Sequence, residues 1–223
     1  MAFDYAPLWI SLKVALCATA AVMVFGTLAA CRLAIGKFRG KMFVETILTL
    51  PLVLPPTVVG YYLLMILGRG TAWGAWLNDS VGLQLLFTWQ GATIAAAIMA
   101  FPLMVKTAAV AMESVEREFI ETARMSGADE WQIFLQVILP LSYKGVLAGA
   151  VLAFARGLGE FGATLMIAGN IPGETQTLPL ALYSSVQEGD GGAAVVYTVL
   201  LTVTSFVILF AVGVYQKFVA GRR

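Results

Sequence analysis

The amino-acid sequence predicts an all-α, polytopic integral membrane protein with about five transmembrane helices, and three observations support this prediction. Of the 223 residues, 60% are hydrophobic and 12% are charged, whereas an ordinary soluble domain carries about 25% charged residues. Several apolar segments reach the roughly 20 residues that a helix needs to cross a hydrocarbon core about 30 Å thick. The polar loops between them are short, so residues 1–223 are expected to form a single transmembrane domain.

Five segments meet the length criterion, and they cover residues 8–33, 43–67, 83–112, 143–167 and 193–219. Apart from Arg32 at its end, the first contains one charged residue, Lys13, which is close enough to the start of the span for its ammonium group to reach the lipid headgroups. The second contains Pro51, Pro55 and Pro56. Because proline removes a backbone hydrogen bond, we expect this span to be bent or broken.

The basic residues orient these spans. Those that follow the first and the last span are Arg32, Lys37, Arg39, Lys41, Lys217, Arg222 and Arg223. The loop of residues 169–192 contains acidic residues but neither lysine nor arginine. Since short cytoplasmic loops are enriched in lysine and arginine, the N-terminus is expected outside and the C-terminus in the cytoplasm. An odd number of spans satisfies this orientation.

Two outer stretches leave the number of membrane helices open between five and six. Residues 178–186 are apolar but too short to span, so they either lie at the membrane interface or fold back into the protein. Trp73, Trp76 and Trp89 flank the loop between the second and third spans. Tryptophan is typical of the aromatic belt at the membrane surface, so this loop is expected to lie there.

The composition argues against several classes of function. There is no histidine, and Cys17 and Cys31 have no zinc-site spacing, so we expect no metal site and no bound cofactor. The net charge of +1 gives no reason to expect nucleic acid as a partner. The sequence has no Walker A loop and no nucleophile–base pattern, so the chain is not expected to be an ATPase or another enzyme. The N-terminus lacks a signal-peptide pattern, and the first span is expected to be retained.

Residues 113–140 form a charged segment between two long apolar spans, on the predicted cytoplasmic side. The pattern predicts a first helix over residues 113–126. Helical ion-pair spacing joins Glu113 with Arg117 and Glu121 with Arg124. Periodicity alone favours a solvated amphipathic loop that lies against the membrane.

Gly127 divides the segment. A glycine at this point is the expected left-handed stop of the first helix. Asp129 can cap a second helix over residues 130–139, and Pro140 is expected to close that helix near the returning span. The segment is therefore expected to be a cytoplasmic helix–glycine–helix unit.

The spacing within this unit is similar to the EAA signature of ABC importer permeases. Glu121-Thr122-Ala123 is followed by three residues and Gly127, and after nine further residues by Val137-Ile138-Leu139-Pro140. Thr122 replaces the middle alanine of the signature, and Val137 replaces its isoleucine. The resemblance implies that the segment forms coupling helices held in a groove of a separate cytoplasmic ATPase, which would bind ATP and Mg²⁺. The residues it implicates in coupling are Glu121, Ala123, Ser126, Gly127, Ala128, Asp129, Glu130, Trp131, Leu139 and Pro140. Residues 126–131 would be the part that protrudes into the groove of the ATPase.

Three other stretches resemble molybdate ABC transporter permeases: residues 51–62 (PLVLPPTVVGYY), residues 101–105 (FPLMV) and residues 152–170, continuing into IPGET. The resemblance implies the type I ABC importer permease fold in a prokaryotic inner membrane. It also implies a homodimer whose central path takes molybdate from an extracytoplasmic binding protein, driven by two ATPase copies. Sulfate or tungstate permeases of the same family are the alternative, because they share variants of these motifs.

Candidate pathway or gate residues lie where charges or prolines interrupt the spans. Arg156 and Glu160 stand one helical turn apart and are expected to pair, either as a structural tie or as an element that moves between states. A charge-swapped pair is expected to retain assembly. The full set is Pro51, Pro55, Pro56, Thr57, Gly60, Tyr61, Arg156, Glu160, Gly162, Thr164 and Asn170. Static kinks, close helix packing and hydrogen bonds between helices are the alternative roles for these residues.

The spans contain no basic cluster that would trap an oxyanion, and Lys13 and Arg156 are the candidate cations. A binding protein that supplies the affinity would explain this. A self-sufficient secondary transporter is disfavoured, because such proteins commonly show inverted repeats and none is visible here.

Overall fold

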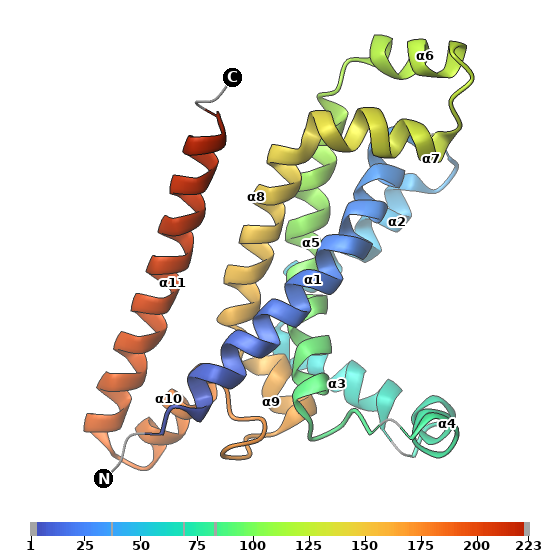
Figure 1. Cartoon of the computed structure of the whole chain (residues 1–223). Coiled ribbons are helices and arrows are strands. Elements are labelled where there is room, and N and C mark those ends of the chain that lie inside the picture. Colours follow the sequence, from blue (N-terminus) through green and yellow to red (C-terminus); the bar gives the residue numbers. More distant parts are fainter. Residues whose placement is uncertain (1–3, 37, 69, 83, 221–223) are drawn as a thin grey trace.

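The computed structural model describes residues 4–36, 38–68, 70–82 and 84–220, and these residues form helices and loops without a strand (Figure 1). The helices are α1 (Ala6–Ile35), α2 (Lys41–Thr49), the short 3₁₀ turn η1 (Leu50–Leu52), α3 (Pro56–Leu67), α4 (Ala72–Val81), α5 (Trp89–Glu113), α6 (Arg117–Met125), α7 (Glu130–Ile133), the π-helical turn η2 (Phe134–Ile138), α8 (Leu139–Leu158), α9 (Gly162–Ala168), α10 (Leu178–Gln187) and α11 (Gly191–Ala220). Lys37, Arg222 and Arg223, and residue 83 at the start of the predicted third span, lie outside the described residues.

The centre of the molecule is a bundle of α1, α5 and α8, and small residues bring these helices close together. A Cβ added to Gly26 of α1 would lie 2.8 Å from Met104 Cγ of α5, and one added to Gly149 of α8 would lie 2.8 Å from Met104 Sδ. Met104 is fully buried between them. In a membrane, close van der Waals packing of this kind drives helix association, because lipid supplies no hydrophobic contrast.

The two ends of the molecule carry different elements (Figure 1). The start of α1 lies at one end with α4, α9 and α10, whereas α6, α7 and the end of α11 lie at the other. Among the described residues, four helices are long and apolar enough to cross a membrane, and the number is five if the bent pair formed by Lys41–Leu52 and Pro56–Leu67 is counted as one span. The described residues therefore agree with five spans that put the charged segment and the end of α11 on the same side.

The second span is broken, as its prolines predict. Lys41–Leu52 and Pro56–Leu67 meet at an angle of 109°. Pro56 is the first residue of α3, a position where the missing N–H costs nothing because no helical partner exists there. Val59 and Leu63 of α3 are buried in the bundle.

The fourth span differs from the prediction at both ends. The helix does not stop at Pro140 but continues from Glu130 to Leu158, with η2 in its middle. There the Leu139 N–H donates to the Phe134 carbonyl, five residues back, and this wider turn precedes the proline, which has no N–H to donate. The predicted span of residues 143–167 ends early because the chain leaves the helix after Leu158 and restarts as α9.

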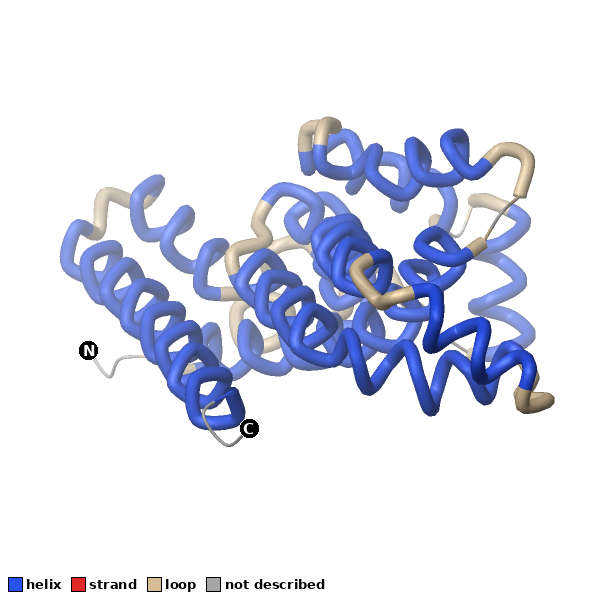
Figure 2. Tube along the Cα trace, turned by 90° about the horizontal axis from the view of Figure 1, so that it is seen from above, coloured by secondary structure: helices blue, strands red, loops and turns tan. Residues whose placement is uncertain are grey.

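The short segment after the fourth span folds back into the protein as α10. Leu178, Leu180 and Ala181 are buried, and the Leu178 N–H donates to Ser11 Oγ of α1 at 2.7 Å. Helix α11 follows and lies at the edge of the bundle (Figure 2). Tyr197 is its one buried hydrophobic residue among those described, so most of α11 is left to face lipid or another chain.

Candidate functional site

The charged segment begins with a turn rather than with a helix. Helix α5 extends to Glu113, and α6 starts at Arg117, so the prediction of one helix over residues 113–126 is wrong in its first four residues. Ser114 Oγ donates to the Ala111 carbonyl at 2.7 Å, and Val115 is buried in the core. The chain thus leaves the α5 axis at this turn while Val115 stays packed on the core.

The corner at Gly127 is a complete Schellman motif. Gly127 has φ +86°, its N–H donates to the Arg124 carbonyl at 3.0 Å, and the Ala128 N–H donates to the Ala123 carbonyl at 3.1 Å. These two bonds satisfy carbonyls that the end of α6 leaves free, and the left-handed backbone favours glycine. The predicted left-handed stop is therefore confirmed.

The next helix opens with a capping box. Asp129 accepts a hydrogen bond from the Gln132 N–H at 2.8 Å, and the Gln132 side chain accepts one from the Asp129 N–H at 3.0 Å. Both bonds satisfy donors that a helix start leaves free. The cap predicted at Asp129 is confirmed. The hydrogen bond that the Gln132 side chain accepts in return was not predicted from the sequence.

Charged pairing in this segment differs from the helical spacing rules. Arg124 binds Glu130 through two bonds, Nε–Oε1 at 2.8 Å and Nη2–Oε2 at 3.1 Å, across the glycine corner. The hydrogen bond that Arg124 donates to Glu130 raises the pKa of Arg124 above its ordinary value. Glu113 pairs with Lys41 at 3.8 Å rather than with Arg117. The sequence could not show the first pair, because a separation of six residues lies outside the three- and four-residue helical rules.

The segment has a buried side and an exposed side. Ile120, Ile133 and Phe134 are buried in the core, so they fix α6 and α7 to the bundle. The predicted coupling residues that are exposed are Glu121, Ser126, Gly127, Asp129, Glu130, Trp131 and Pro140, whereas Ala123, Ala128 and Leu139 are half-buried. Met125 is 82% exposed and Trp131 58% exposed. These large apolar side chains on a polar corner are typical of an interaction surface. Met125 was not among the coupling residues predicted from the sequence.

A second candidate site is the break between α8 and α9. Arg156 Nη1 lies 2.6 Å from Glu160 Oε2, which confirms the expected pair. Glu160 is only 2% exposed, and its Oε1 accepts a hydrogen bond from the Ala163 N–H at 2.8 Å. Glu160 thus lies outside the helix and caps the start of α9, where a negative charge is stabilised by the free N–H groups.

Close packing of α3 on α9 brings four of the predicted gate residues together. A Cβ on Gly60 would lie 2.7 Å from Met166 Cβ and 2.9 Å from Ala163 Cα, so α3 crosses α9 almost in backbone contact. A Cβ on Gly162 would lie 3.0 Å from Pro56 Cβ and 3.4 Å from Thr57 Cγ2. The arrangement attaches α9 to the broken second span, and both helices begin directly after a break.

The substitution Gly60→Val tests this contact. It is expected to destabilise the protein by about 2 kcal/mol, because the clash is with the rigid backbone of α9. Thermal unfolding in detergent, followed by tryptophan fluorescence, measures the loss. Gly213→Val in α11 is the matched control, since a Cβ there meets nothing within 4 Å. Equal unfolding temperatures for the two variants would contradict the contact.

The comparisons with known proteins now identify the family. The family model described as "Binding-protein-dependent transport system inner membrane component" matches residues 22–221. The chain belongs to this family of transport permeases. The permease is 42% identical over 206 residues to the "Putative molybdenum transport system permease protein YvgM" of Bacillus subtilis (strain 168), covering 92% of this chain and 91% of the relative. It is 46% identical over 187 residues to the "Molybdenum transport system permease protein ModB" of Escherichia coli (strain K12), covering 83% and 82%.

A solved structure confirms the fold of the permease. The inward facing MetNI methionine ABC transporter aligns with a TM-score of 0.74 over 96% of this chain and 94% of that chain. The sequences are 18% identical, so this likeness establishes the type I ABC importer permease fold alone.

The remaining predicted pathway residues of the permease are dispersed. Tyr61 and Pro55 are exposed, Pro51 is half-buried and Thr164 is buried within α9. Asn170 lies in a loop network, where its side chain donates to Ser184 Oγ at 2.7 Å and accepts from Gln176 Nε2 at 3.0 Å. Asn170 therefore ties the loop to α10, which is one of the ordinary roles weighed above.

The spans contain two further basic residues that were not among the predicted candidates. Lys106 of α5 and Lys144 of α8 are exposed cations besides Lys13 and Arg156. No group of three metal-ligating side chains occurs within the described ranges.

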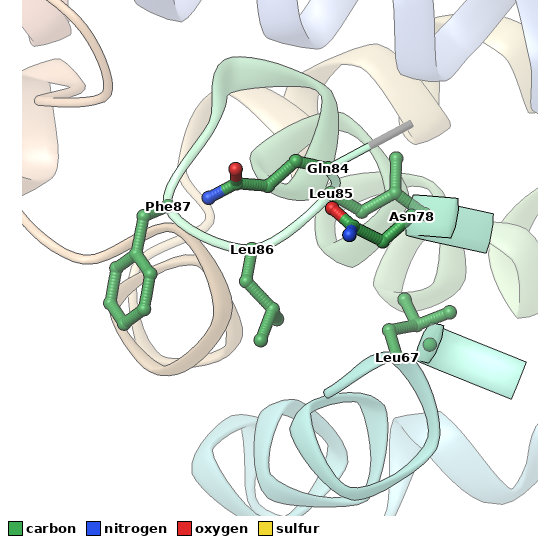
Figure 3. Close-up of a pocket in the computed structure, with 7 residues that line it drawn as sticks. Leu67, Asn78, Gln84, Leu85, Leu86 and Phe87 are labelled. Carbon is green, nitrogen blue, oxygen red and sulfur yellow. The ribbon is translucent and has the colours of Figure 1, made fainter. Parts of the chain in front are cut away.

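A small cavity of ≈ 210 Å³ lies between the end of α3, α4 and residues 84–87 (Figure 3). Phe87 has φ +59° and its N–H donates to the Ile167 carbonyl of α9 at 3.0 Å. A non-glycine residue with this backbone is uncommon and strained. In Figure 3 its ring points away from Leu67 and Asn78 on the other side of the cavity. The contact links the loop before α5 to the end of α9.

Proposed function

We propose that two copies of the permease form the translocation path of an ATP-driven molybdate importer in a prokaryotic inner membrane. Two cytoplasmic ATPase subunits per transporter would bind ATP and Mg²⁺, and they would also bind the segment at residues 113–140. An extracytoplasmic binding protein would deliver molybdate to the opposite face. The permease itself would make and break no covalent bond.

One observation carries the coupling part of this proposal, namely the pre-formed corner at Gly127. The Schellman motif, the Asp129 capping box and the Arg124–Glu130 pair hold the corner in one geometry before any partner binds. Pre-organised surfaces bind more tightly because less freedom is lost on association. Buried Ile133 and Phe134 would transmit force from the corner to α8, which continues from α7 without interruption.

Support for molybdate as substrate comes from the relatives. YvgM and ModB, whose names specify molybdenum transport, match along most of their length and most of this chain. The few dispersed cations of the spans suit a path that does not hold its anion tightly. Tungstate and sulfate are the alternatives, since both are tetrahedral divalent oxyanions like molybdate.

Uptake of labelled molybdate into cells that express the permease, its ATPase and its binding protein tests the proposal. We expect uptake to require all three proteins and to be inhibited by unlabelled molybdate but not by a large excess of sulfate. Uptake that persists without the ATPase would indicate a secondary transporter. Inhibition by sulfate at the same concentration as molybdate would assign a mixed oxyanion permease instead.

A further inference from the structure

A second cavity, of ≈ 360 Å³, opens at the end of the molecule where α1 begins. It is bounded by the first turns of α1, the start of α5 and the loop at residues 173–175. The side chains used below are Trp9, Lys13, Trp89, Gln90 and Glu174. The coupling corner and the α3–α9 contact do not contribute to it.

Lys13 supplies a cation to the cavity. Its ammonium nitrogen lies 3.5 Å from the centre of the Trp89 ring, a favourable cation–π arrangement. None of the ion pairs in the described part of the chain involves Lys13. An ammonium group has three N–H donors, and the ring face uses only one side of it. Lys13 can therefore bind an anionic group in the cavity while it remains on Trp89.

The same cavity holds groups that suit a cation. Glu174 lines it with an exposed carboxylate. Gln90 Oε1 is buried and accepts no hydrogen bond from any described residue. A buried acceptor without a donor is unfavourable, so a ligand that brings an N–H group would stabilise the site. The lining thus fits a ligand with a negative and a positive group close together.

The surface beside the cavity distinguishes a lipid from a small ion. Trp9 is 69% exposed, and the exposed apolar side chains of α1 continue past the cavity with Leu16 (59%) and Val24 (54%). Trp9 and Trp89 suit the membrane interface, where tryptophan rings lie at headgroup level. A ligand held here at its polar end would have an apolar helix face beneath it for acyl chains.

We propose that this cavity binds the headgroup of a zwitterionic aminophospholipid. Lys13 binds the phosphate, Glu174 and Gln90 accept hydrogen bonds from the primary ammonium, and the acyl chains lie along α1. Phosphatidylethanolamine has this chemistry and is the probe. A lipid bound here would fix the outer end of α1 against α5.

The test measures the lipid retained by the assembled transporter, purified in detergent with added phosphatidylethanolamine and analysed by native mass spectrometry. Lys13→Gln is expected to reduce bound phosphatidylethanolamine about fivefold, the effect of one basic side chain near an anionic headgroup. Lys13→Arg should retain it. Glu174→Gln should remove any preference for phosphatidylethanolamine over phosphatidylglycerol. Lys144→Gln, which removes an exposed lysine from α8, is the matched control and should change nothing.

Three results would overturn the proposal. The first is equal lipid retention by the wild-type and Lys13→Gln transporters. The second is displacement of the lipid by millimolar inorganic phosphate, which would assign the cavity to a free anion. The third is a change of oligomeric state in Lys13→Gln at unchanged lipid content, which would assign this face of α1 to a second copy of the chain.

Discussion

Replacing Gly127 by valine is expected to reduce co-purification of the ATPase with the permease by at least about fivefold. The left-handed backbone at Gly127 costs a residue with a Cβ about 1–2 kcal/mol, and more for a β-branched one. A Cβ on Gly127 meets nothing within 4 Å, so the cost comes from the backbone and not from a clash. The strain is relieved if the corner opens, which separates Arg124 from Glu130. Pull-down of the ATPase and substrate-stimulated ATP hydrolysis measure the effect.

Gly189→Val is the matched control for this prediction. Gly189 also has a positive φ, +74°, and open space around its Cβ position, but it lies in the loop between α10 and α11. Both variants therefore carry the same backbone strain at opposite ends of the permease. Normal ATPase binding by Gly127→Val would show that the corner is not the docking element. An equal loss in both variants would mean that strain acts through folding.

Glu160→Ala is expected to destabilise the permease by about 3 kcal/mol, the low end of the cost of breaking a buried ion pair. The low end applies because the Arg156 side chain keeps 27% of its surface exposed and can be rehydrated in part. The variant also leaves the Ala163 N–H without its acceptor at the start of α9. Thermal unfolding in detergent measures the stability, and molybdate uptake measures the consequence for transport.

Glu160→Gln separates the two roles of this residue. The glutamine amide oxygen can still accept from the Ala163 N–H, whereas the charge opposite Arg156 is lost. We expect an intermediate loss of stability. If both variants unfold like the wild type, neither the pair nor the cap stabilises the break. Normal uptake by Glu160→Ala would exclude a role of the break in the transport cycle.

The structure changes the expectation for the charge-swapped pair. From the sequence, exchange of Arg156 and Glu160 should preserve an ion pair and therefore assembly. An arginine at position 160 has no acceptor atom, so it could not cap α9. The swap is now expected to restore only the pairing part of the loss.

The features that follow from the sequence alone are those set by local chemistry. Span length and apolar composition predicted about five passes, and the three prolines predicted the break in the second span. Gly127 and Asp129 determined the corner, because a left-handed stop and a helix cap each depend on a few neighbouring residues. The spacing of the EAA-like signature pointed to the family that the comparisons confirm.

Other features depend on packing between segments that are distant in sequence. Val115 and Ile120 pack on a core built by residues of α1, α5 and α8, on either side of the turn that separates α5 from α6. Glu160 lies outside its predicted helix because α9 packs on α3, where Gly60 and Ala163 nearly touch. The helical periodicity of the sequence cannot predict such a contact, because the contact depends on how two helices that are distant in sequence cross each other.

The same distinction applies to polar partners. Arg124 stands six residues from Glu130, and Ser11 binds the backbone of Leu178 from 167 residues away. Sequence spacing identifies partners only within one regular helix. The apolar spans, the glycine stop, the helix cap and the family of this permease therefore follow from local sequence patterns. The tertiary structure decided which charges pair, where the fourth span breaks and how α10 folds back, because each depends on the burial of groups that are far apart along the chain.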